Sequence, residues 1–349
     1  MTINSIIKDA EEFEKEYPLP KQELNIKVVG VGGAGCNSLH HLQKLGVKNI
    51  DSIAINTDYV HLKSIHAKKK ILLGGHLTRG NGAGGLPEIG AHAAELSRRE
   101  LETVFRGTQI AFVIAGMGGG TGTGAAPVVA EIAKEAGAIV ISVATSPFRY
   151  EKGRIHTARQ GIAALRRFSD CLIVLDNNKL LDIAPTLPLE HAFGVMDQVI
   201  AEMISGVTDT LTLPSLINID YADMRTIFSY ADGNMSTLLY GEGSEEEPEK
   251  IVEDALNNPF LDVDYTGARA AIIHITGGTK LTLRNANAVI EGIASQFSED
   301  ANIIFGARIL PEFEGSIRVM AIAVGVKSLV PLEPEGIYEI VPGTIELTR

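Results

Sequence analysis

The chain has 349 residues and 45% hydrophobic content, which is enough for one large domain or two ordinary ones, each with its own core. Its formal net charge of −12 argues against a broad, sequence-independent nucleic-acid surface, because such a surface needs clustered Lys and Arg. Two cysteines, Cys36 and Cys171, are too few for a disulfide framework or a cysteine-rich zinc site. We therefore expect no nucleic-acid partner and a reducing compartment.

Residues 1–23 are interpreted as an N-terminal extension. Several acidic side chains lie there, where a signal peptide would be basic and then apolar. No uninterrupted apolar stretch approaches the roughly 20 residues that a membrane helix requires. The sequence thus predicts a cytoplasmic protein that reaches any membrane through partners rather than by inserting into it.

A strand over residues 24–29 is followed directly by a glycine loop over residues 30–35 and then by a helix with Leu39, Leu42 and Leu45 on one face. The loop has the form GxGxxG, whose default interpretation is a dinucleotide-binding turn. That interpretation requires an acidic residue at the end of the next strand. Asp51 has the right spacing but opens the strand over residues 52–55, which weakens a dehydrogenase assignment without excluding it.

A second glycine run, residues 116–124, lies between an apolar strand over residues 109–115 and a helix over residues 125–136 with Pro127 in its first turn. Glycines there allow the backbone to approach a ligand, and the helix N-terminus adds partial positive charge, a combination that favours phosphate. A flexible linker is the alternative, but linkers do not usually separate a buried strand from a well-formed helix. Neither glycine run contains the lysine that a P-loop NTPase needs.

Between and after these units, the sequence predicts further parts of an α/β domain. Residues 74–90 are rich in glycine and are predicted to be a long loop, and apolar strands are predicted over residues 139–144 and 171–175. Glu151 and Arg154 are placed in a loop before a helix that begins at about Thr157. Polar or glycine clusters thus follow successive parallel strands, at the edge where open α/β sheets bind ligands.

A long helix over residues 190–207 carries Phe193 and Asp197 one turn apart, so an aromatic ring and a carboxylate share a face. Taken alone, a core Phe and an exposed Asp would explain the pair. Asn218, Asp220 and Asp223 follow within an apolar stretch. A helix from about Met224 would explain Asp223 as a cap, but not the other two.

The remaining chain predicts a compact α+β domain with no phosphate loop. A solvated connection is expected over residues 241–250. The other predicted elements are helices over 251–256 and 282–297 and strands over 270–275, 303–310 and 317–326.

These separated motifs resemble, in the right order, those of the FtsZ family of cell-division GTPases in the tubulin superfamily, over about residues 25–326. The motifs are Gly32-Gly33-Ala34-Gly35, Asn56-Thr57-Asp58, Gly82 to Gly85, Gly116 to Gly124, Pro147-Phe148 with Glu151, and Asn218 to Asp223. The resemblance implies an α/β parallel-sheet GTP-binding domain joined by a long central helix to a smaller α+β C-terminal domain. The implied ranges are an extension (1–23), the GTP-binding domain (24–188), the helix (189–210), the C-terminal domain (211–327) and a tail (328–349).

The resemblance also assigns roles to residues. The phosphates would be cradled by Gly32, Gly33, Ala34, Gly35, Cys36, Gly119, Gly120, Thr121, Gly122, Thr123 and Gly124. Glu151 and Arg154 would hold the ribose, and Asn177, Phe193 and Asp197 would clamp the guanine. Asn218, Asp220 and Asp223 would form a catalytic loop that reaches the nucleotide of the next subunit. The chain departs from the family in having Cys36 in place of Asn and in spacing Glu151 and Arg154 one residue closer.

The implied function is a GTPase that polymerises with itself into filaments and forms the division ring in the cytoplasm. GTP or GDP would be bound with Mg²⁺, with no metal site predicted directly from the protein, and membrane-tethering and other cell-division proteins would be partners. The alternatives are a non-hydrolysing GTP-binding scaffold of the same fold and a nicotinamide-dependent oxidoreductase.

Overall fold

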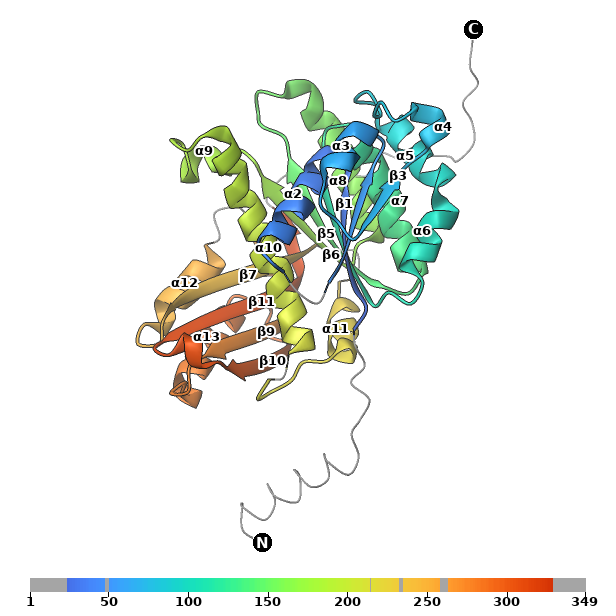
Figure 1. The fold of residues 1–349 in the computed structure, drawn as a ribbon. Helices are drawn as coiled ribbons and strands as arrows, with labels where there is room; N and C mark the ends of the chain where they lie inside the picture. The colour runs from blue at the N-terminus through green and yellow to red at the C-terminus, as the bar shows by residue number, and fades with distance from the viewer. Residues whose placement is uncertain (1–23, 48–49, 214, 232–234, 258–262, 329–349) are drawn as a thin grey trace.

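Six parallel strands form the first sheet of the computed structural model (Figure 1), which describes residues 24–47, 50–213, 215–231, 235–257 and 263–328. Their order is β3-β2-β1-β4-β5-β6. The bounds are β1 (Ile26–Val31), β2 (Asp51–Asn56), β3 (Lys69–Leu72), β4 (Ile110–Gly116), β5 (Ile139–Ser146) and β6 (Cys171–Asp176). The predicted extension 1–23 and most of the predicted tail lie outside the described residues.

Apolar side chains cover both faces of the central strands, as expected of a parallel sheet buried under helices. One face packs against α2 (Gly32–Lys44), α3 (Tyr59–Ser64) and α10 (Leu189–Thr212). The other face packs against α5 (Pro87–Leu96), α6 (Arg98–Phe105), α7 (Thr121–Glu135) and α8 (Lys152–Phe168). The predicted strands over residues 109–115, 139–144 and 171–175 are confirmed.

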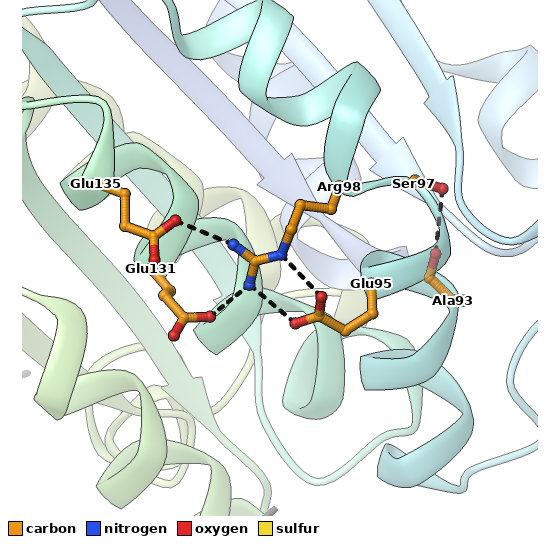
Figure 2. A network of polar contacts seen from close by, with 6 residues as sticks. All are labelled: Ala93, Glu95, Ser97, Arg98, Glu131 and Glu135. Carbon is orange, nitrogen blue, oxygen red and sulfur yellow. Dashed lines mark hydrogen bonds and ion pairs between the residues drawn. The ribbon is translucent and has the colours of Figure 1, made fainter. Parts of the chain in front are cut away.

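Arg98, the first residue of α6, ties α5 and α6 to α7 (Figure 2). Its guanidinium donates from Nε and Nη2 to Glu95, at 2.8 and 3.0 Å. It also bonds Glu131 at 2.8 Å and Glu135 at 3.0 Å, both on α7. These bonds raise the pKa of Arg98, the bond to Glu95 contributing most. The network joins α5 and α6 to the C-terminal half of α7, at the end of that helix opposite the glycine run.

α10 joins this domain to a second sheet with the strand order β10-β9-β11-β7, in which β8 also pairs with β11 (Figure 1). One core runs from α2 through α10 to the inner face of that sheet, and α12 and α13 cover the outer face. The bounds are α11 (Tyr221–Phe228), β7 (Met235–Ser244), α12 (Pro248–Leu256), β8 (Val263–Asp264), β9 (Ala270–Gly277), α13 (Leu283–Ala294), β10 (Asn302–Ile309), η1 (Pro311–Phe313) and β11 (Ser316–Ser328). Among the described residues, no helix combines the length and apolar character needed to cross a membrane.

Several helices begin earlier than the sequence predicts. α7 starts at Thr121 instead of residue 125, α8 at Lys152 instead of Thr157, and α11 at Tyr221 instead of Met224. Pro127 therefore lies inside α7 and not in its first turn. The low helix propensity of glycine hides the start of α7 in the sequence, but close packing of Gly122 and Gly124 against neighbouring backbone overrides it.

Three other predictions are wrong. The predicted loop over residues 74–90 contains α4 (Gly75–Thr78) and the start of α5. The predicted connection over residues 241–250 is mostly the end of β7 and the start of α12, because β11 pairs with β7 as far as Ser244. Leu45 is 44% exposed, since it is the C-cap of α2 and no longer on its buried face.

Candidate nucleotide-binding site

The two glycine segments meet at the carboxyl edge of the first sheet. A Cβ placed on Gly32 would lie 2.7 Å from the nitrogen of Gly122, and one on Gly116 would lie 2.5 Å from the Cβ of Ala34. The N-termini of α2 and α7 therefore lie side by side, and neither helix has an acidic residue in its first turn. Two adjacent helix starts with unpaired N–H groups form a site for anions.

Packing explains most glycines of the two segments without any ligand. A Cβ would come within 2.1 Å of the Ile114 carbonyl oxygen at Gly35, within 2.8 Å of the Leu86 nitrogen at Gly120, and within 1.9 Å of the Pro87 carbonyl oxygen at Gly124. These glycines allow backbone segments to touch. Their presence alone is therefore no argument for a nucleotide.

Gly33, Gly119 and Gly153 are different. None has a positive φ, and an added Cβ at any of them would meet no heavy atom within 4 Å. Gly153 lies in the first turn of α8, which packs against the second glycine run: a Cβ on Gly118 would lie 2.9 Å from the Cβ of Arg154. Three glycines at or next to the starts of α2, α7 and α8 are thus required neither by conformation nor by packing.

Hydroxyl and thiol groups of the predicted phosphate cradle bond mainly to the protein itself. The Thr121 hydroxyl lies 2.6 Å from that of Thr57, and Thr123 Oγ1 accepts a 2.8 Å bond from the N–H of Gly118. The Cys36 thiol faces the core, 3.3 Å from the carbonyl oxygen of Gly30, and burial raises its pKa to about 12. Cys36 can therefore offer a ligand no thiolate.

Glu151 and Arg154 are adjacent in the structure, although their spacing is shorter than the family pattern. Arg154 Nη1 donates a 2.7 Å bond to Glu151 Oε2, and the arginine side chain is 63% exposed. Glu151 precedes α8 and Arg154 lies in its first turn, so the predicted loop position of Arg154 is corrected. The helix start brings the backbone and Cβ of Arg154 next to Gly118 of the glycine run despite the missing residue.

Asp197 on α10 faces α2. Ser38 donates a 2.5 Å hydrogen bond to Asp197 Oδ1, and burial raises the pKa of the carboxyl group. Phe193, one turn earlier, is 38% exposed, and its ring meets that of Phe148 edge-on at 6.0 Å between centroids. The alternative of a core Phe with an exposed Asp is wrong: here the ring is partly exposed and the carboxylate is mostly buried.

Asn177 follows β6 at the same edge of the sheet, where its neighbour Asn178 accepts a 2.8 Å bond from the N–H of Arg149. Among the hydrogen bonds of the described residues, none involves the Asn177 side chain. The amide therefore remains available to a ligand.

The predicted catalytic loop lies away from the glycine segments and contains Asn218, Asp220 and Asp223. Asp220 caps α11 and accepts a 2.8 Å bond from the N–H of Asp223, whose side chain in return accepts a 3.0 Å bond from the N–H of Asp220. The helix begins earlier than predicted, so capping accounts for both aspartates. Asn218 Oδ1 accepts a 2.9 Å bond from the N–H of Ser215.

These carboxylates are far from the glycine segments of their own chain. The Tyr221 hydroxyl lies 3.5 Å from the carbonyl oxygen of Gly137, just beyond the C-terminus of α7, whereas the glycine run is at its N-terminus. α7 has 15 residues, so its ends are about 22 Å apart at about 1.5 Å per residue. Figure 1 likewise shows α11 at the end of the first sheet opposite α3.

The position of Asp51 speaks against a dinucleotide site. Asp51 opens β2 and forms ion pairs with Lys27 at 3.5 Å and Lys68 at 2.8 Å. β2 ends at Asn56, and the following Asp58 caps α3 by accepting from the N–H of His61. The carboxylates near this strand are thus engaged in structural contacts, and none at its end is placed to hold a ribose.

Sequence reasoning did not identify Ser38, the hydrogen-bond donor to Asp197. The two residues are 159 positions apart, and nothing local in the sequence links them. Among the described residues, no group of three or more His, Cys, Asp or Glu side chains is arranged to hold a metal ion.

Comparison with known proteins agrees with this geometry. The Tubulin/FtsZ family GTPase domain matches residues 25–185, and the FtsZ family C-terminal domain matches residues 235–327. The chain is 50% identical over 335 residues to cell division protein FtsZ 2 of Methanocaldococcus jannaschii, covering 94% of this chain and 88% of that protein. It is also 50% identical over 310 residues to FtsZ 2 of Haloferax volcanii, covering 88% and 77%.

Solved structures give the same result. An empty FtsZ dimer from M. jannaschii superimposes with a TM-score of 0.80 at 39% identity, covering 95% of this chain and 99% of that one. CetZ2 of H. volcanii, at 21% identity and a TM-score of 0.72, shares the fold. The chain belongs to the FtsZ family of cell-division proteins, with the GTPase domain of the tubulin superfamily.

Proposed function

We propose that this protein binds GTP between α2, α7, α8 and α10, polymerises head to tail with itself, and hydrolyses GTP only where two subunits meet. It would act in the cytoplasm at the division site, together with membrane-tethering and other cell-division proteins. Mg²⁺ would accompany the nucleotide and balance the phosphate charge. Because no described cluster is arranged to hold it, most of its ligands would come from phosphate oxygens and water.

The single observation that carries the nucleotide site is the open space at Gly33, Gly119 and Gly153. A side chain at any of these positions would fit the protein, so glycine is explained by something that the chain itself does not supply. The three lie in or next to the first turns of α2, α7 and α8, and helix N-termini favour a polyanion. A triphosphate lying against the backbone would account both for the glycines and for the helix N-termini.

Base recognition is assigned to Asp197 with Phe193. A carboxylate accepts from the N1–H and amino group of guanine, whereas adenine offers no such pair of donors. The Ser38 bond holds one carboxylate oxygen, which leaves the other free to accept. The partly exposed ring of Phe193 offers an apolar face to the base. Asn177 and the ion pair of Glu151 with Arg154 would supply the remaining contacts to the nucleotide.

Hydrolysis between subunits is supported by distance and by charge. Asp220 and Asp223 are on the order of 20 Å from the phosphate site of their own chain. Permanent carboxylates beside a triphosphate would oppose its binding, whereas carboxylates that arrive with the next subunit can orient a water after the nucleotide is bound. GTP turnover then depends on assembly.

One observation favours a second candidate, the non-hydrolysing GTP-binding scaffold. The reciprocal capping of Asp220 and Asp223 explains both residues without any catalytic role. The two candidates differ in one measurement, because a scaffold would bind GTP without turnover at any protein concentration. We favour hydrolysis because Asp220 is exposed and Asp223 is partly exposed while they cap.

The nucleotide site is tested with Gly33→Ala and Gly119→Ala. Both variants should fold with an unchanged or slightly higher unfolding temperature without nucleotide, because alanine fits and restricts the unfolded chain. GTP affinity should fall about tenfold or more. Gly75→Ala is the matched control, since its Cβ would meet only the Leu72 side chain at an ordinary 3.6 Å. Unchanged GTP affinity in both folded variants would refute the site.

A further inference from the structure

The segment between α10 and α11, which carries Asn218 and leads to Asp220, is held against β10. Ile217 and Ala307 exchange two backbone hydrogen bonds of 3.1 Å. A Cβ on Gly306 would lie 2.9 Å from the carbonyl oxygen of Ile217, so the segment and the strand are in close contact. The position of the two aspartates relative to the second sheet is therefore set by this strand.

Arg308 is the next residue on β10 and is only 5% exposed. Its Nη2 donates to the carbonyl oxygen of Asp209, to that of Leu213 at 3.2 Å and to the hydroxyl of Ser215 at 3.2 Å. Asp209 is in the last turn of α10, and Leu213 is its C-cap. One guanidinium thus satisfies carbonyls at the end of α10 and also bonds the segment that leaves it.

His274 on β9 also contacts Ser215. Its Nε2 is 3.4 Å from the Ser215 hydroxyl, and a Cβ on Gly306 would lie 2.9 Å from its ring. Burial, with the charge of Arg308 nearby, lowers the pKa of His274 to about 4. The ring is therefore neutral near pH 7, and Arg308 remains the charged donor at the end of α10.

We propose that Arg308 is a positioning residue for GTP hydrolysis: by tying the end of α10 and Ser215 to β10, it sets where Asp220 and Asp223 meet the nucleotide of the next subunit. The inference rests on the proposed function, because it assumes that these aspartates act across the junction. A displacement of about 1 Å can cost around 100-fold in rate even when it arises away from the chemistry. A merely structural Arg308 would instead affect folding and assembly without a specific effect on turnover.

The test uses the full chain with Arg308→Met and Arg308→Lys. Methionine has similar length but no donor, and lysine keeps the charge without the planar fork. GTP affinity and the critical concentration for assembly should stay within about twofold of wild type. GTP turnover per polymerised subunit should fall about tenfold or more in Arg308→Met and less in Arg308→Lys. If Arg308→Met does not fold, Arg308→Lys is used for every comparison.

Arg98→Met is the matched control. It removes an arginine that bonds three carboxylates in the first domain, away from the α10 to α11 segment. It should lower the unfolding temperature while leaving turnover per polymerised subunit nearly unchanged. An equal loss of turnover in Arg98→Met would show that general destabilisation produces the effect, and this would overturn the inference.

A double-mutant cycle with Asp223→Ala separates the possible failures. If Arg308 acts through the aspartates, adding Arg308→Met to Asp223→Ala should reduce turnover by less than twofold further. Two independent, multiplicative losses would overturn the inference but leave the proposed function intact. Normal turnover in Asp223→Ala alone would refute hydrolysis across the junction, and it would also refute the role proposed for Arg308.

Discussion

Ser38 on α2 donates a 2.5 Å hydrogen bond to the carboxylate of Asp197 on α10. The bond links the helix that follows the first glycine loop to the helix that joins the two domains. It holds the Asp197 carboxylate against α2. Because burial raises the pKa of Asp197, this carboxylate is also easier to protonate than an ordinary one.

Asp197→Ala should weaken binding of GTP and GDP by about 100-fold or more, since a charged acceptor for two donors is lost. Ser38→Ala should cost roughly fivefold, because it removes only the orienting bond. ATP binding should be weak in all three proteins. Titration calorimetry would measure these affinities, and unchanged GTP affinity in Asp197→Ala would remove this residue from the site.

The raised pKa of Asp197 should make GTP affinity depend on pH. A protonated Asp197 no longer accepts two hydrogen bonds from guanine, so GTP affinity should fall as the pH decreases through its raised pKa. The decline should begin at a higher pH than an ordinary aspartate would cause. Asp197→Asn should bind weakly at every pH and lose this part of the pH dependence. An identical acid decline in wild type and Asp197→Asn would assign the effect to another group.

Arg154→Ala should lower nucleotide affinity while leaving the unfolding temperature of the nucleotide-free protein nearly unchanged. Its ion pair with Glu151 is exposed, and such pairs contribute about 0–1 kcal/mol. Lys250→Ala is a close control, because Lys250 forms an exposed pair with Glu247 at the same spacing, on α12. A loss of folding in Arg154→Ala without a binding defect would mark Arg154 as structural.

The parallel strands are predictable from the sequence because burial on both faces leaves continuous apolar runs, as at Ile110–Gly116. The helix starts are less predictable. Thr121 and the following glycines are poor helix formers, and they are helical because α5 packs against them closely enough to exclude a Cβ on Gly124. Local propensity cannot report such a contact with a distant segment.

The candidate site is likewise only partly predictable from the sequence. Its glycine segments follow strands and are visible as motifs, and the order of the motifs suffices to indicate the family. The contact of Ser38 with Asp197 and that of Arg308 with Ser215 join residues 159 and 93 positions apart. They depend on how α10 lies between the two sheets, which no local pattern encodes.

The buried His274 should lower the free energy of unfolding in acid. Its pKa is about 4 in the folded protein and about 6.5 in an unfolded chain. Between these values the unfolded state binds more protons, so the free energy of unfolding should fall by roughly 3 kcal/mol as the pH decreases from about 7 to 4. His274→Gln should remove that part of the decline, as measured by denaturant unfolding at several pH values.

Other groups titrate in the same range, so the comparison must be made between variants. Burial raises the pKa of Asp209, which faces Arg308, and its protonation should act in the opposite direction as the pH falls. Asp209 is present in both proteins, and the difference between them isolates His274. The exposed His76→Gln is the control and should follow wild type. Parallel curves for wild type and His274→Gln would contradict a neutral buried His274.

The last prediction is that Asp223 acts across the junction between subunits. Asp223→Ala should bind GTP normally and still assemble, yet hydrolyse GTP slowly. The loss of half the capping box should cost about 1 kcal/mol of stability. Thr282→Ala, which removes the side-chain cap of α13, is the control for that loss and should keep normal turnover.

Mixing two inactive variants tests the mechanism directly. Asp223→Ala supplies an intact nucleotide site, and Asp197→Ala supplies an intact catalytic loop, so a mixed junction is complete where the catalytic loop of Asp197→Ala meets the nucleotide site of Asp223→Ala. Each variant alone should turn over GTP slowly, and the mixture should regain turnover that is greatest when both are abundant. If each subunit carried its own complete active site, no mixture could recover activity. A mixture as inactive as its separate components, under conditions where both proteins enter the same filaments, would therefore contradict hydrolysis across the junction.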